Sequence, residues 1–257
     1  MPELPRAALV TGAARRIGRG IALALAALGF DLAVHHHRSR REAQALVEEI
    51  RARGRRAVAV EGDLEREEAP GAILERAQEA LGPIGLLVNN AALFLDDPPQ
   101  ELSGAVWARQ MAVNLRAPIA LSLAFAGRLP PKSEGLIVNV LDSRILDPTP
   151  NYLSYTVSKA GLWAATQVLA RRFAPRVRVV ALALGLVLPG PRERRETFDR
   201  LVARTPLGRP VALGEIEAAL RFCVEARSLT GVLLPLDGGR HMGALASPGT
   251  QNPTRKA

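Results

Sequence analysis

The amino-acid sequence predicts an α/β fold: a doubly wound parallel sheet of about seven strands with helices on both faces. Short apolar runs alternate with helical segments along almost the whole chain of 257 residues. Most of these runs lack polar alternation, as expected of strands that are buried on both faces. No linker or composition shift interrupts the series, so we expect one domain over residues 1–245. The polar tail 246–257 should be flexible.

The first half of the chain opens with the apolar run 7–10, which leads into a glycine-containing turn and the helical pattern 17–29. Strand, glycine turn and helix form the start of a βαβ unit. The amphipathic segment 41–54 should be a helix that ends at Gly54, a typical C′ residue. The other elements expected here are strands at 31–37, 56–60 and 85–92 and a helix at 65–82.

The second half continues the same alternation. Helical stretches should cover 103–129, with Pro118 marking a kink or a boundary. The remaining expected elements are strands at 135–142, 177–184 and 231–236 and helices at 152–174, 193–203 and 214–226.

Composition and charge exclude several classes of protein. A hydrophobic content of 48% with 22 glycines suits a folded domain with a large core. The net charge of +9 could indicate nucleic-acid binding. However, the arginines are scattered along helices and interleaved with Glu, and two Trp, two Tyr and six Phe form no evident stacking platform. We therefore expect no nucleic-acid partner.

The single cysteine, Cys223, excludes an internal disulfide and should be a small buried residue on a helix. No secretory signal is evident at the N-terminus. No apolar run reaches the roughly 18 residues that a membrane span needs. We therefore expect a soluble cytoplasmic protein.

Tyr155 and Lys159 stand four residues apart, which places them on one face of a helix. A phenol has a pKa of about 10, and a neighbouring ammonium would lower it and make tyrosine a usable proton donor. The chain has only three lysines against 31 arginines, so a lysine here suggests a need for a compact ammonium. This pattern alone is common on helices, and it supports a catalytic role only if a dinucleotide site lies upstream.

Such a site is indicated by the turn TGAARRIG, in which Gly12 and Gly18 lie between the first strand and the first helix. Backbone N–H groups and the helix N-terminus at such a turn can hold a pyrophosphate. Glycines also simply close turns of this kind. Arg16 stands where another glycine is usual, and its guanidinium could reach a phosphate or a substrate.

The end of the second strand should face the adenosine ribose of a dinucleotide. An acid there would select NAD. This chain has His37, Arg38 and Ser39, which could bind a 2′-phosphate by charge-assisted hydrogen bonds, so NADP is preferred. A metal site on the three histidines 35–37 is disfavoured, because alternate strand residues point to opposite faces.

Two further strand ends carry candidate ligands. Asp63 follows the third strand, where its carboxylate could accept from the adenine amino group; a helix N-cap is the alternative. Asn90 and Ala91 follow the fourth strand, at the edge where open α/β sheets bind ligands.

Together, TGAARRIG, Asp63, NNAA, Asn114, YTVSK and the closing LPLDGG resemble the short-chain dehydrogenase/reductase family over about residues 6–241. The resemblance implies a Rossmann-type NADP-binding domain and a catalytic tetrad of Asn, Ser, Tyr and Lys. Asn114, Tyr155 and Lys159 match this tetrad. The place of the serine, thirteen residues before the tyrosine, is filled by Asp142.

That departure resembles the pteridine reductase and dihydromonapterin reductase branch, where an aspartate replaces the serine. Arg16, the HRS triplet and Phe94 agree with the branch, in which the arginine contacts the pterin and the phenylalanine stacks on it. Ala92 and Leu184 depart from the usual serine and proline. Each of these residues also has an alternative role. A one-residue shift could bring Ser143 to the place of the serine, and Phe94 could only pack within its loop. Asp142 could be a turn or N-cap residue, and Asn114 could form the hydrogen bonds of a helix bulge.

The resemblance implies a reductase that transfers hydride from NADPH to a pteridine C=N bond. Tyr155 would donate the proton, Lys159 would grip the ribose, and Asn114 would hold a water. Residues 186–206 would form a mobile lid. The alternatives are a reductase of simple carbonyls such as 3-oxoacyl thioesters, or a non-catalytic NADP-binding protein. The family also implies a homotetramer. The full set implied to bind the cofactor is Gly12, Arg16, Ile17, Gly18, His37, Arg38, Ser39, Asp63, Leu64, Asn90, Ala91, Tyr155, Lys159 and Gly185.

Overall fold

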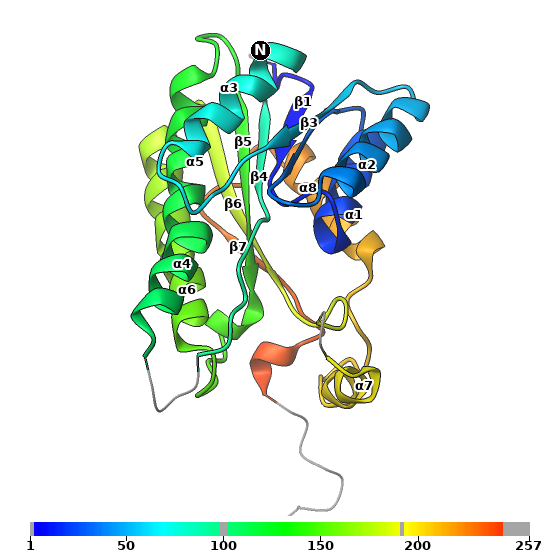
Figure 1. Cartoon of the computed structure of the whole chain (residues 1–257), viewed down its shortest axis with the longest axis vertical. Coiled ribbons are helices and arrows are strands. Elements are labelled where there is room, and N and C mark those ends of the chain that lie inside the picture. The colour runs from blue at the N-terminus through cyan, green and yellow to red at the C-terminus, as the bar shows by residue number, and fades with distance from the viewer. Residues whose placement is uncertain (1–2, 98–101, 191–192, 244–257) are drawn as a thin grey trace, which may run out of the picture.

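The computed structural model describes residues 3–97, 102–190 and 193–243 and has three layers, with one parallel sheet between two layers of helices (Figure 1). The seven strands follow the order β3-β2-β1-β4-β5-β6-β7, and every pair of neighbours is parallel. The strands are β1 Ala7–Val10, β2 Asp31–His36, β3 Ala57–Glu61, β4 Leu86–Asn89, β5 Gly135–Asp142, β6 Val177–Leu184 and β7 Leu233–Leu236.

Helices α1, α2 and α8 cover one face of this sheet, and α3, α4, α5 and α6 lie on the other (Figure 1). The α7 helix stands apart, at the end where the strands terminate (Figure 1). The helices are α1 Arg16–Ala27, α2 Arg40–Ala52, α3 Ala69–Leu81, α4 Gly104–Met111, α5 Ala117–Arg128, α6 Leu153–Phe173, α7 Arg195–Ala203 and α8 Leu213–Glu225.

The apolar strands explain this arrangement. All residues of β1 and β4 are buried, and the side chains that alternate along the sheet contribute to hydrophobic clusters beneath both helical layers. A strand that is apolar on both sides needs helices on both sides, and parallel neighbours need helical crossovers. The predicted fold class and the predicted order of the elements are confirmed.

The direction in which successive strands are added to the sheet reverses between β1 and β4. From β1 the chain adds β2 and β3 on one side, and then returns to place β4 on the other side of β1. Open α/β sheets bind ligands in the crevice outside the carboxyl ends of their strands at such a switch point. The ends of β1, β2, β3 and β4 therefore define where a cofactor can lie.

Two expectations about helices need correction. The third helix begins at Ala69 and not at residue 65, because the Asp63 carboxylate accepts a hydrogen bond from the Glu65 amide and holds a turn there. The helical region from 103 is not continuous α-helix: a π-helical turn, Ala112–Arg116, separates α4 from α5. Pro118 lies in the first turn of α5, at a boundary as expected.

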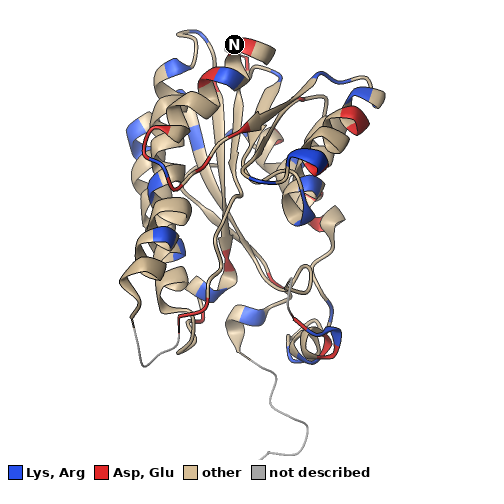
Figure 2. Ribbon diagram, viewed as in Figure 1, with Lys and Arg blue, Asp and Glu red and all other residues tan. Residues whose placement is uncertain are grey.

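The structure also tests predictions about single residues, surface charge and membrane spans. Gly54 follows α2 with a positive φ of 79°, and Cys223 is fully buried on α8. Lys and Arg are spread over the helices among Asp and Glu, without one continuous basic face in this view (Figure 2). Within the described residues, no helix combines the length and hydropathy that crossing a bilayer requires. The tail 246–257 lies outside the described residues.

Candidate active site

Asp142 and Tyr155 meet where β5 ends and α6 begins. The Tyr155 hydroxyl donates to Oδ2 of Asp142 over 3.4 Å, and the other carboxylate oxygen accepts from the Arg144 amide at 2.8 Å. The second contact makes Asp142 the N-cap of a short 3₁₀ helix, Ser143–Ile145. Asp142 is therefore a turn residue and also faces the tyrosine.

Ser143 does not take the place of Asp142. Its side chain is 1% exposed, and its hydroxyl has no hydrogen-bond partner within the described residues. The chain keeps the thirteen-residue spacing, and the carboxylate, not the neighbouring hydroxyl, contacts Tyr155.

Lys159 lies one turn along α6 from Tyr155 and is 3% exposed. Its ammonium donates to the Val140 carbonyl at 2.8 Å and lies 5.9 Å from the centre of the Tyr155 ring. Burial lowers the pKa of Lys159 from 10.5 to about 8, and the Asp142 carboxylate opposes that shift. The lysine therefore loses its proton at a lower pH than an exposed lysine does.

The direction expected for the pKa of Tyr155 is wrong for this structure. Burial raises that pKa well above 10, the charge on Asp142 raises it further, and only Arg144 opposes them. The Lys159 ammonium sits against the ring and is bonded to Val140, so it does not offset the burial of the hydroxyl. At neutral pH Tyr155 keeps its proton.

Asn114 lies in the π-helical turn and is fully buried. Its amide oxygen accepts from the Leu93 amide at 2.7 Å, and its amide nitrogen donates to the Leu93 carbonyl at 2.8 Å and to Ser158 at 3.1 Å. The side chain thus fixes the loop after β4 against α6. Its amide makes the contacts of a bulge hydrogen bonder, and the role of holding a water stays a prediction.

Phe94 follows that fixed loop and is 53% exposed. Its ring stacks on Tyr152 at 4.5 Å and meets the edge of Tyr155 at 4.7 Å. Arg144 lies over the other ring, 5.1 Å from the centre of Tyr152. Phe94 is therefore part of an aromatic group beside the tyrosine and also presents apolar surface to solvent.

The glycine turn leaves no room for larger side chains. A Cβ on Gly18 would lie 2.2 Å from the Gly12 carbonyl oxygen, and Gly12 has a φ of +62°. The first intrahelical bond of α1 runs from the Arg19 amide to the Arg15 carbonyl, so earlier amides, including those of Ile17 and Gly18, have no partner inside the helix. This tight turn fits a pyrophosphate at the helix N-terminus.

Arg16 has a left-handed backbone, with a φ of 54°. Its guanidinium donates to the Pro189 carbonyl at 2.7 Å and to the Leu188 carbonyl at 3.5 Å. It therefore bridges the glycine turn to the loop after β6, which belongs to the lid expected at 186–206. Residues 191–192 of that segment lie outside the described residues, and α7 forms nine of the others.

Around the end of β2, His37 and Arg38 are exposed and Ser39 is half-buried; all three line one cleft of about 530 Å³. Ser39 is the N-cap of α2 but makes no side-chain capping bond, so its hydroxyl remains available for a ligand. The helix N-terminus adds partial positive charge at this place. The end of β2 thus suits an anion.

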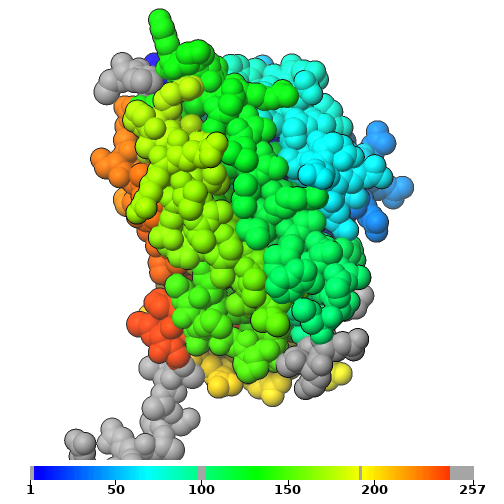
Figure 3. Space-filling view, turned by 90° about the vertical axis from the view of Figure 1, so that its left-hand side faces the viewer, coloured from blue at the N-terminus to red at the C-terminus, as the bar shows by residue number. Residues whose placement is uncertain are grey.

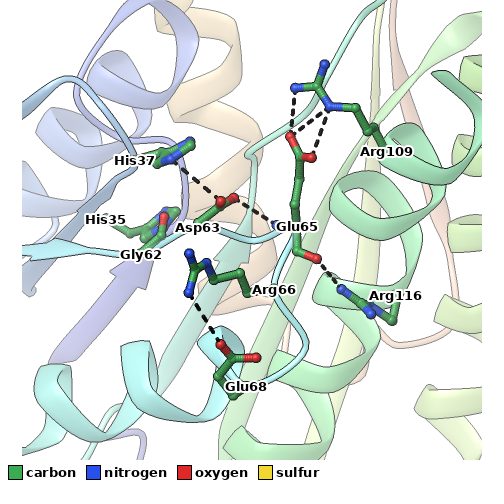
Figure 4. A network of polar contacts seen from close by, with 9 residues as sticks. All are labelled: His35, His37, Gly62, Asp63, Glu65, Arg66, Glu68, Arg109 and Arg116. Carbon is green, nitrogen blue, oxygen red and sulfur yellow. Dashed lines mark hydrogen bonds and ion pairs between the residues drawn. The ribbon is translucent and has the colours of Figure 1, made fainter. Parts of the chain in front are cut away.

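The loop after β3 also lines this cleft, and Figure 4 shows the polar contacts of that loop. Asp63 lies 3.8 Å from His37, and Leu64 is buried beside it. Arg109 of α4 grips Glu65 through both carboxylate oxygens, and Arg116 donates to the Glu65 carbonyl. Asp63 makes a turn rather than the expected N-cap alternative, because the N-cap of α3 is Glu68.

Three more site residues lie along the strand ends. The Asn90 side chain donates to the carbonyls of Thr11 and Gly12, and the amides of Asn90 and Ala91 both donate to the Thr11 hydroxyl. The Gly185 amide donates to Leu236, and a Cβ there would lie 2.6 Å from the Cα of Asp237. Gly185 therefore allows the ends of β6 and β7 to approach.

Sequence reasoning missed two residues of this site. Thr11 could have been found from its place at the last position before the glycine turn. Tyr152, which has a φ of 63° and stacks on Phe94, carries no sequence signal beyond its aromatic character.

The profile of the family described as short chain dehydrogenase matches residues 6–198 of this chain. Among solved structures, FolM alternative dihydrofolate reductase 1 from Brucella canis, complexed with NADP, is 41% identical with a TM-score of 0.91, covering 96% of this chain and 98% of that one. The protein of the same name from Brucella suis, also with NADP, is 43% identical with a TM-score of 0.90, covering 94% and 96%. The 3-oxoacyl-[acyl-carrier-protein] reductase of Staphylococcus aureus is 28% identical over 245 residues, 93% of this chain and all of that protein.

The perturbed pKa of Lys159 can be observed directly, because the chain has only three lysines. With ¹³C-labelled lysine, one side-chain resonance should titrate near pH 8, because burial lowers the pKa of Lys159 to about 8. This resonance should remain in Lys132→Arg. Asp142→Asn should move the low titration further down, because the carboxylate supports the ammonium. Titration of every lysine above pH 10 would contradict this description of the site.

Proposed function

The chain belongs to the short-chain dehydrogenase family, and we propose that it is an NADPH-dependent reductase of pteridines. Hydride would pass to a C=N bond of a substrate such as dihydrobiopterin, dihydromonapterin or a dihydrofolate. The observation that carries the proposal is the Asp142 carboxylate facing the Tyr155 hydroxyl, where most of the family has a serine hydroxyl. The similarity to two structures of FolM alternative dihydrofolate reductase supports it.

The cofactor is NADP(H). Both FolM structures contain NADP. In this chain the tight turn at Gly12 and Gly18 suits the pyrophosphate, and Arg38 and Ser39 suit the 2′-phosphate. When bound, the reduced nicotinamide supplies the hydride.

Tyr155 would supply the proton that reduction of a C=N bond also requires. Because burial and Asp142 keep its pKa well above 10, the hydroxyl is protonated at neutral pH and can donate to the ring nitrogen. The tyrosinate left behind can be reprotonated from Lys159, whose pKa of about 8 makes it a proton source close to neutral pH. Bond and proton counts then balance: one C–H and one N–H form.

Asp142 would give the site its substrate class. A pterin presents amide and amino N–H groups along one edge, and a carboxylate can accept from them, which a serine hydroxyl does less strongly. Phe94, half-exposed beside Tyr155, would offer an apolar face to the bicyclic ring. When the substrate binds, the Arg16 guanidinium would exchange its hydrogen bonds to the carbonyls of Leu188 and Pro189 for bonds to an acceptor on the ligand.

A second candidate is reduction of a 3-oxoacyl thioester. It is favoured by the 28% identity with a 3-oxoacyl-[acyl-carrier-protein] reductase over nearly the whole chain. A ketone needs an oxyanion donor beside the tyrosine, however, and the carboxylate of Asp142 is an acceptor when ionised. The first candidate is therefore preferred.

We further propose that the enzyme is a homotetramer, as the family resemblance implies. An apolar groove on α4, the π-helical turn and α5 is lined by Met111, Leu115, Ile119 and Leu123, and Val168 of the neighbouring α6 is 63% exposed. Figure 3 views the molecule from the side that these helices cover. Exposed apolar surface of this kind is typical of protein interfaces. Light scattering should give about four times the chain mass of 27.5 kDa.

The direct test of the activity is NADPH consumption with dihydrobiopterin, with dihydrofolate, with an acetoacetyl thioester and without substrate. The proposal expects rapid oxidation with a pteridine and little with the thioester. Turnover of the thioester alone would favour the second candidate.

Arg38→Ala should weaken NADPH binding by about ten- to a hundredfold, since a lost charge-assisted hydrogen bond costs roughly 1.5–3 kcal/mol. NADH affinity should barely change. Arg41→Ala removes the same charge from the exposed face of α2 and is the matched control; it should bind NADPH almost normally. Equal losses for NADPH and NADH in Arg38→Ala would refute the assignment of the 2′-phosphate site.

Tyr155→Phe should keep NADPH affinity and lower pteridine turnover by about 10²–10⁴-fold, the usual range for general acid catalysis.

Asp142→Asn and Asp142→Ser should each lower kcat/KM for dihydrobiopterin at least about tenfold, because a carboxylate-to-N–H hydrogen bond is worth about 1.5–3 kcal/mol. Ser143→Ala is the neighbouring control and should retain turnover. If Ser143→Ala is impaired and the Asp142 variants are not, the roles assigned to these two positions are wrong.

A further inference from the structure

We infer that His35 is a positioning residue for the dinucleotide: its neutral imidazole clamps the glycine turn into the shape that receives the pyrophosphate. The inference rests on the cofactor part of the proposed function and not on the pteridine. His35 is the first of the three consecutive histidines 35–37, and neither a metal site nor the 2′-phosphate site accounts for it.

The geometry begins with two hydrogen bonds to one ring. Nδ1 of His35 lies 3.1 Å from the Gly12 amide, and Nε2 lies 3.1 Å from the Gly62 carbonyl. The ring is 2% exposed and lies beside Gly62 at the wall of the cleft (Figure 4). It therefore ties the turn after β1 to the loop after β3.

These two partners fix the tautomer. A backbone amide can only donate, so Nδ1 must be the acceptor and carry no proton. A carbonyl can only accept, so Nε2 must carry the proton and donate. Burial, the first cause, and the positive charges of His36, His37 and Arg76 lower the pKa of His35 from 6.5 to about 4, against the bond to Gly62. The ring consequently stays neutral, with its acceptor free for Gly12, throughout the physiological range.

The same residue also holds the next peptide. The His35 carbonyl accepts from the Ala13 amide at 2.9 Å. From the other side, the Asn90 side chain donates to the carbonyls of Thr11 and Gly12, at 2.9 and 3.3 Å. The N–H groups of the turn therefore donate to His35 of β2, and its carbonyls accept from Asn90, which follows β4.

These hydrogen bonds limit which backbone amides can bind the pyrophosphate. The amides of Gly12 and Ala13 are used on His35 and cannot serve a ligand, so the pyrophosphate must rely on the N-terminal amides of α1. Those amides are reached across a narrow gap, since a Cβ on Gly18 would already lie 2.2 Å from the Gly12 carbonyl. Without the bond to the His35 ring, the peptide between Thr11 and Gly12 can rotate, and the turn that holds the Gly12 carbonyl beside Gly18 then changes shape.

Two substitutions separate the two bonds of the ring. In His35→Asn, the amide oxygen can take the place of Nδ1 and accept from Gly12, but Gly62 loses its donor. In His35→Gln, the longer side chain can place an N–H near the position of Nε2 and serve Gly62, but Gly12 loses its acceptor. His35→Leu fills the space and offers neither bond.

The experiment is a fluorescence titration of the full-length apo protein and each variant with NADPH and with NADH, without substrate, alongside thermal unfolding. We expect His35→Asn to bind NADPH within about threefold of wild type, and His35→Gln and His35→Leu to bind at least about tenfold more weakly, the loss of roughly one hydrogen bond. NADH should show the same pattern, because the turn serves both cofactors, unlike in Arg38→Ala.

A merely structural role would lower the unfolding temperature of the Asn and Gln variants without separating their affinities. Equal affinities for these two variants, or a rank order that follows unfolding temperature, would overturn the inference, and the pair decides it even if His35→Leu does not fold. Failure of the wild type to bind NADPH would instead refute the cofactor assignment. Absence of pteridine turnover in a wild type that binds NADPH normally would contradict only the proposed substrate.

Discussion

The contact between the Asp142 carboxylate and the Tyr155 hydroxyl depends on the junction of β5 with α6, and the chemistry of the site depends on that contact. Asp142 is the last residue of β5, and Tyr155 lies in the first turn of α6. The Val140 carbonyl, two residues before Asp142, holds the Lys159 ammonium. Strand and helix are thus joined by the same groups that would move a proton.

Burial sets the properties of these groups. Removal from water raises the pKa of Tyr155 and lowers that of Lys159, so that both groups favour their neutral forms more than they would in solvent. A neutral phenol and an ammonium that loses its proton easily form a usable donor pair. The carboxylate between them counters the effect on the lysine and strengthens it on the tyrosine. Burial therefore sets the protonation states, and Asp142, which would also select the proposed substrate, modifies them.

The sequence predicted the fold well because the fold follows from local patterns. Apolar runs without alternation, separated by helical segments, allow little but a parallel sheet covered on both faces. The places of Gly12, Arg38 and Asn90 could be predicted for the same reason: they follow strands whose carboxyl ends must share one edge. The start of α3 and the π-helical turn were not predictable, since each depends on a specific side-chain bond or on packing against other elements.

The partners of the site residues could not be predicted either. The bonds of Asn114 to Leu93, of Arg16 to Pro189 and of His35 to Gly12 join positions far apart in the chain, and no spacing rule encodes them. The pKa of Tyr155 was expected to fall because only the nearby lysine was visible in the sequence. The opposing effect, burial, is a property of the packed structure.

The central claim is that this site reduces a C=N bond beside a carboxylate. It is tested most directly by offering NADPH deuterated at the transferable position together with equal amounts of dihydrobiopterin and an acetoacetyl thioester, and locating the deuterium by NMR. The account predicts deuterium on the ring carbon of the reduced C=N bond, with almost none on the carbinol carbon of the thioester product. Deuterium mainly in the hydroxyacyl product, or in neither substrate, would contradict it.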